Sequence, residues 1–168
     1  MTSKLGCGFV YDLTVADKKT GAVRAQHLGE KNRVPLEGLN DIAAAYLKGG
    51  AGPGALYIGL WSGARIPDGT ETAANLLTLV TEVTNYTQAT RLPLVLGPVA
   101  NGTCSNEASL ARFDILGSAT VNGAFLSTAQ AKSANTGKLL SFVRFANPRA
   151  VDETVYIEVL TGFQFISL

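Results

Sequence analysis

The run TVYIEVLTGFQFISL, residues 154–168, carries the clearest structural pattern of this chain. Apolar and polar side chains alternate along it with a period of two, which is typical of a β-strand that packs one face on a core. We expect an inner strand of a sandwich, with a core-facing side formed by Val155, Ile157, Val159, Phe163 and Phe165. Three earlier apolar runs predict further strands: ARFDILG (111–117), VNGAFLS (121–127) and KLLSFVRFANP (138–148).

Length and charge limit the classes of protein that fit. The 168 residues are enough for one ordinary domain that needs no disulfide or metal to fold. Charged residues make up only 16% of the chain and the fourteen Lys and Arg are scattered, whereas nucleic-acid and acidic-membrane binding need a concentrated positive field. We therefore expect neither partner. No secretory signal and no apolar stretch of about 20 residues is present, so we expect a soluble protein made in the cytoplasm.

The N-terminal third predicts a hairpin and one helix. Residues 7–26 resemble a β-hairpin, and we assign residues 1–33 to an arm separate from a domain over residues 34–168. Pro35 and the pair Gly49-Gly50 bound a helix over residues 36–47. Its apolar residues fall on one helical face, and the other face is poor in charge, which allows a second neighbour there. The apolar face comprises Leu36, Leu39, Ile42, Ala43, Tyr46 and Leu47.

The middle of the chain predicts short strands separated by turns. We expect a buried strand over residues 55–61 and then a long surface loop with one helical turn over residues 62–81. Further strands are expected near 82–90, 93–99 and 102–105. With eight to ten strands in total, the predicted fold class is all-β: an antiparallel β-sandwich or jelly roll with one α-helix.

Residues that could carry chemistry are few. His27 is the only histidine, which excludes every site that needs two imidazoles, and we expect it to be hydrogen-bonded or exposed to solvent. The acids are dispersed and no pair stands out as a catalytic couple. Thr136-Gly137-Lys138 lacks the remaining residues of a phosphate-binding loop, and Cys7 and Cys104 fit no metal spacing, so reduced thiols are expected. We predict no catalytic, cofactor-binding or metal-binding residues, and no enzyme.

Four aromatic residues allow two interpretations. Tyr57, Trp61, Tyr86 and Tyr156 would form a sugar-stacking platform if several lay exposed on one face, as in a carbohydrate-binding module. In a chain with a single Trp, core or interface anchors are the commoner role of such side chains.

A series of sequence blocks resembles small structural proteins of tailed-bacteriophage virions. The blocks are VPLEGLNDIAAAYLKGG, LYIGLWSG, TEVTNYTQATRLP, SNEASLARFDI, VNGAFLST and TGKLLSFVRFANPRAV. The resemblance covers about residues 33–165, most of the chain. Members of this group are variously described as head decoration, cement or tail proteins, and no catalytic residues accompany the resemblance. It implies a virion component whose partner is the major capsid protein.

Within these blocks, five residues are candidates for structural or interaction roles: Trp61, Tyr86, Arg91, Arg144 and Arg149. We hypothesise that Arg91 and Arg144 make hydrogen-bonded or ionic contacts that fix loops. Arg144 and Arg149 flank the predicted strand end at residues 145–148.

The expected function is that of a non-enzymatic capsid cement protein, assembled into the virion as a homotrimer. It would bind the outer head surface where capsomers meet and act by strand addition and apolar burial on several subunits at once. A tail or neck component is the first alternative, and a carbohydrate-binding module on the virion is the second.

Overall fold

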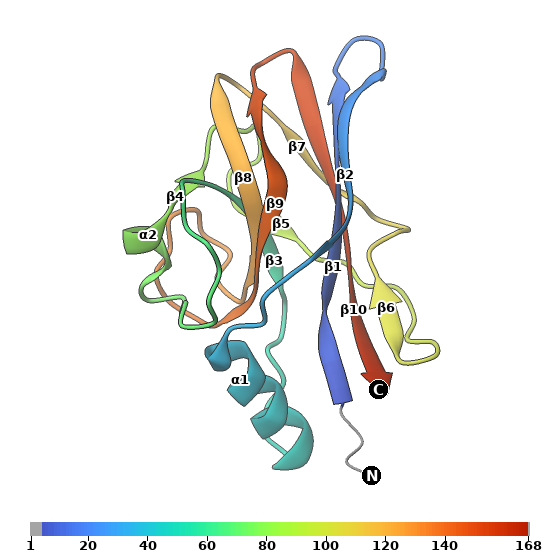
Figure 1. Ribbon diagram of the computed structural model, residues 1–168, viewed down its shortest axis with the longest axis vertical. Coiled ribbons are helices and arrows are strands. Elements are labelled where there is room, and N and C mark those ends of the chain that lie inside the picture. Colours follow the sequence, from blue (N-terminus) through green and yellow to red (C-terminus); the bar gives the residue numbers. More distant parts are fainter. Residues whose placement is uncertain (1–4, 168) are drawn as a thin grey trace.

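Two antiparallel β-sheets packed face to face make up most of the molecule. The computed structural model describes residues 5–167, and Figure 1 shows the two layers with one helix, α1 (Leu36–Leu47), at one end. The all-β antiparallel sandwich and the helix predicted over residues 36–47 are confirmed. Neither helix of the described residues has the length and hydropathy to cross a membrane.

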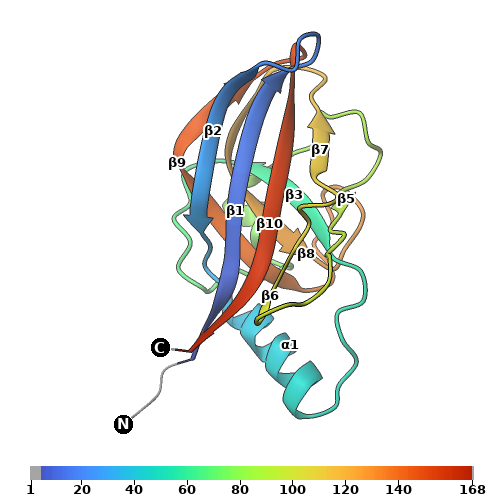
Figure 2. The same ribbon diagram turned by 90° about the vertical axis from the view of Figure 1, so that its right-hand side faces the viewer.

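The first sheet is built around β10 (Val155–Ser167), the strand with the strongest alternation in the sequence. Along one edge β10 pairs with β1 (Leu5–Asp17) in a continuous antiparallel register, and β2 (Val23–Lys31) follows β1. Its other edge is shared by β6 (Thr103–Ser105) and β7 (Ala111–Asp114). Figure 2 shows β2, β1 and β10 side by side.

The second sheet has the short strand β3 (Tyr57–Ser62) near its centre. On one side β3 pairs with β8 (Ala119–Ser127), which in turn pairs with the edge strand β9 (Leu139–Val151). On the other side it pairs with β4 (Thr81–Val83) and β5 (Leu92–Pro93). The strands expected near 82–90 and 93–99 are therefore much shorter than predicted.

The main core lies between the sheets, and β10 contributes to it as expected over most of its length. Val155, Ile157 and Val159 are buried, and Phe163 is partly buried against the same cluster. Phe165 is 47% exposed, so its predicted core position is wrong. The cause is geometric, because this end of β10 extends beyond the strands of the second sheet (Figure 1).

The N-terminal hairpin is present as β1 and β2, but it is not a separate arm. Strand β1 lies between β2 and β10. Its alternate side chains Phe9, Tyr11, Leu13 and Val15 are buried in the main core. Because these side chains need a second sheet to cover them, the hairpin is an integral part of the sandwich.

A second, smaller apolar cluster covers the outer face of the second sheet. The loop after β3 contains one helical turn, α2 (Leu76–Leu79), as predicted for residues 62–81. This loop packs side chains of α2 and its flanks over aromatic residues of the sheet; the cluster comprises Trp61, Ala73, Leu76, Val80, Phe125, Leu139 and Phe142. The second sheet is thus buried on both faces.

Candidate interaction surface

Arg91 lies at the centre of a buried polar cluster rather than on the surface. Its guanidinium forms a bidentate pair with Glu82, with Nε to Oε1 at 2.9 Å and Nη2 to Oε2 at 2.8 Å. The same group donates to the carbonyls of Ala129 and Ala134, and Glu82 also accepts the backbone N–H of Ser133. The pair therefore holds the loop over residues 128–138 against the start of β4.

Tyr86 lies beside this cluster and is also buried. Its ring meets Phe113 edge to face, and the ammonium of Lys132 lies 3.7 Å from the ring centroid. Lys132 donates to the carbonyls of Thr84 and Tyr86. Burial raises the pKa of the Tyr86 phenol and lowers the pKa of Lys132. These contacts serve the fold.

Trp61 is fully buried and is a core anchor. Its indole N–H donates to the carbonyl of Val143 at 3.0 Å, and its ring stacks on Phe142. Since Trp61 and Tyr86 are buried, the four aromatic residues do not form an exposed sugar-stacking platform. Tyr57 and Tyr156 are partly exposed and belong to different sheets.

Arg149 and Arg144 connect β9 to other parts of the chain. Arg149 Nε donates to His27 Nε2 at 2.9 Å, and the imidazole stacks on Phe145 with ring centroids 5.4 Å apart. His27 is thus buried and hydrogen-bonded, and this contact joins β2 to β9. Arg144 donates to the carbonyl of Arg65 at 2.9 Å, which fixes the loop after β3.

The carboxylates form local contacts instead of a shared site. Glu71 is fully buried and accepts Arg65 Nε at 2.9 Å together with two backbone N–H groups. The Thr70 hydroxyl is the main reason that the pKa of Asp68 falls to about 2, and Arg65 lowers it further. The described part of the chain contains no group of three His, Cys, Asp or Glu side chains that could hold a metal ion. Cys7 and Cys104 are both free thiols.

Helix α1 faces the rest of the molecule with its small and polar side. Gly38 is buried, and a Cβ at this position would lie 2.9 Å from the Cα of Leu140 on β9. Glu37 accepts the backbone N–H of Ala73 at 2.9 Å and that of Leu139 at 2.7 Å. These contacts attach the first turn of the helix to the end of the sandwich.

The opposite side of α1 is apolar and uncovered. Tyr46 is 87% exposed, Leu47 75% and Leu36 62%, and Leu39 and Ala43 are also exposed. The sequence identified this apolar face correctly, but an amphipathic pattern does not say whether the same domain or another molecule covers the face. Here its own domain covers only Ile42, in part, and leaves the rest of the face exposed.

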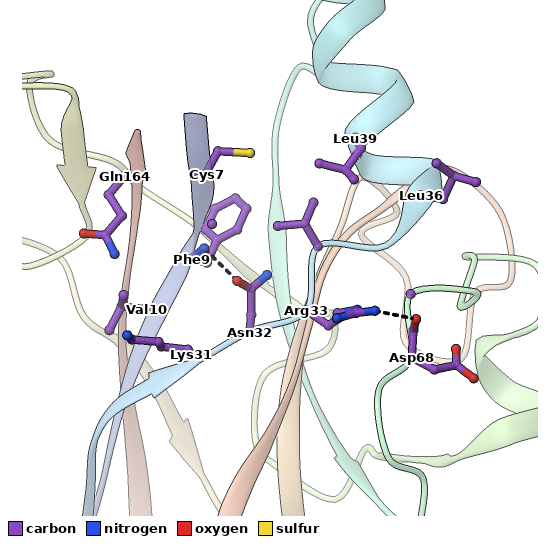
Figure 3. Close-up of a pocket in the computed structure, with 14 residues that line it drawn as sticks. Cys7, Phe9, Val10, Lys31, Asn32, Arg33, Leu36, Leu39, Asp68 and Gln164 are labelled. Carbon is purple, nitrogen blue, oxygen red and sulfur yellow. Dashed lines mark hydrogen bonds between the residues drawn. The ribbon is translucent and has the colours of Figure 1, made fainter. Parts of the chain in front are cut away.

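A groove of about 570 Å³ lies between α1 and β1 and continues this apolar surface. Figure 3 shows the thiol of Cys7 and the side chain of Leu39 pointing toward one another across it, with Lys31 and Arg33 nearby. Its apolar lining includes Phe9. No family model and no curated protein matches the sequence.

Proposed function

We propose that this chain is a non-enzymatic structural protein of a tailed-bacteriophage virion, and that it acts as a cement protein on the outer surface of the head. Its partner is the major capsid protein, and its own assembly state is a homotrimer. The resemblance over about residues 33–165, carried by the order of the sequence blocks, supports the virion assignment. One structural observation carries the assembly role: the apolar face of α1 points away from the domain that holds the helix.

The physical reason is that such a face gains free energy only by burial against another molecule. Apolar surface is stabilised by roughly 25 cal/mol for each Å² removed from water. Contiguous exposed apolar patches on soluble proteins mark interaction sites. A cement protein repeats such a contact on several subunits of a lattice, so modest single contacts add up to large avidity.

Electron microscopy of virions with and without this protein tests the proposal. We expect extra density at regular positions on the head surface, and hundreds of copies per particle. If the head surface is unchanged and density is lost at the neck or tail, the chain is a tail or neck component. Sedimentation velocity of the purified protein tests the trimer, which predicts a mass three times the 17.6 kDa of one chain.

A further inference from the structure

The uncovered face of α1 and the adjoining groove form one continuous surface, called the α1 surface below. It is defined by the exposed side chains Leu36, Leu39, Ala43, Tyr46 and Leu47, together with the groove between α1 and β1. Leu36 and Leu39 belong to both parts, because they line the groove as well as the helix face. A partner segment that lies along the helix could therefore place a side chain in the groove.

The charge at the edge of this surface is positive and unneutralised. Lys31 and Arg33 both line the groove and are exposed, and neither pairs with a carboxylate among the residues that the structure describes. Asp68, the acid in the lining, pairs with Arg65 at 2.8 Å. The side-chain hydrogen bond of Arg33 runs to the carbonyl of Asp68, which leaves other guanidinium donors open for a carboxylate.

We propose that the α1 surface docks an acidic, apolar segment of a partner protein. Apolar side chains of the segment pack on Leu39 and Tyr46, and a carboxylate next to them pairs with Arg33 or Lys31. In the setting of the proposed function, on which this step rests, the segment belongs to the capsid shell. Complementary charge of this kind selects the partner and speeds its association.

A second copy of this chain fits the surface less well. A two-fold contact centred on the groove would bring Lys31 and Arg33 of each copy toward those of the other. Like charges that meet across an interface oppose association. The acidic partner is therefore the occupant that the charges favour.

Binding of two synthetic peptides tests the proposal directly. The peptides have identical length and leucine spacing, but one is rich in glutamate and the other in lysine, so that only the sign of their charge differs. Fluorescence anisotropy of the labelled peptides should report saturable binding of the glutamate peptide, with affinity that falls as salt rises. The double variant L39D/Y46D should weaken this binding at least tenfold. The double variant K31E/R33E should reverse the preference toward the lysine peptide. As control, Leu28→Asp introduces one such charge at an exposed leucine of β2 and should bind like wild type.

Three results would overturn the proposal. The first is absence of saturable glutamate-peptide binding, and the second is equal binding of the two peptides. The third is a wild-type oligomer that dissociates in L39D/Y46D, which would assign the α1 surface to contacts between copies. Circular dichroism of each variant controls for folding.

The same variants, added to virions stripped of this protein, separate the two proposals. If L39D/Y46D binds the shell as well as the wild type does, the α1 surface is not the docking site, and the cement function stands. If the wild type prefers the glutamate peptide but does not bind the shell, the cement function is refuted, and the docking role of the α1 surface stands.

Discussion

Removal of both partners of the buried Glu82–Arg91 pair should destabilise the protein far less than the sum of the two single removals. In Arg91→Met, the Glu82 carboxylate stays buried, with both side chains of the native pair only 1% exposed, and keeps just the backbone donor of Ser133. An uncompensated buried charge of this kind costs about 3–5 kcal/mol of unfolding free energy. Glu82→Leu leaves the guanidinium with carbonyl acceptors only and should cost a similar amount.

The double variant E82L/R91M leaves neither charge of the pair buried. The unfolding free energy that it loses should therefore be well below the sum of the losses in the two single variants. The remaining cost comes from three backbone groups that lose a side-chain partner: the carbonyls of Ala129 and Ala134 and the N–H of Ser133. Water can reach part of this surface loop, so we expect about 2–4 kcal/mol for the double variant, against about 6–10 kcal/mol for the summed single variants.

Urea unfolding measures these differences through Trp61, the only tryptophan and a fully buried one. Asp114→Asn is the matched control, because it breaks the surface pair Arg112–Asp114, whose side chains are 46% and 29% exposed. This control should cost less than about 1 kcal/mol. Single-variant losses as small as the control, or a double-variant loss equal to the sum, would refute the reasoning.

Two further predictions concern backbone space and acid stability. Gly123→Ala would place a Cβ 2.0 Å from a carbonyl oxygen of β9 and should lower the unfolding free energy measured in urea by roughly 3 kcal/mol or more. The control Gly52→Ala places its Cβ in open space and should be near neutral, so equal effects of the two variants would contradict the close approach at Gly123. The backbone N–H of Thr20, followed by the side chain of Arg24, lowers the pKa of Asp17 from 3.8 to about 2, so the stability that this carboxylate adds above pH 3.8 should be lost as pH falls toward 2. Arg24→Ala should raise that pKa in a carbon-detected NMR titration yet leave it below 3.8, and an unchanged value would refute the role of Arg24.

Local periodicity predicted the long strands and the helix, but neither the lengths of the short strands near 82–90 and 93–99 nor which part of the molecule covers an apolar face. The pattern of β10 correctly identified the core side at Val155, Ile157 and Val159. It failed at Phe165, because the length of the opposing sheet is not encoded in the strand itself. The hairpin misassignment has the same origin, since nothing within residues 5–31 indicates that β1 pairs with β10 at the far end of the chain.

For the candidate residues too, the sequence indicated which residues matter but not which distant residues they contact. The sequence singled out Arg91 and Arg149, but their contacts depend on the folded topology. Arg149 meets His27 across 122 positions of sequence, and Glu82 is one of thirteen dispersed acids. A residue type indicates what a side chain can bind, whereas the fold decides which partner is within reach.

Helix α1 combines firm attachment with an uncovered face. The contacts of Glu37 and Gly38 hold the first turn through small and polar groups, which leaves the leucines and Tyr46 free. If the apolar side had packed on the sandwich, the same helix would have stabilised the domain and offered nothing to a partner. A helix already folded and anchored loses little conformational freedom when it is covered, so more of the burial energy contributes to binding. The proposed assembly role therefore rests most directly on the orientation of α1, which turns its apolar side away from its own domain.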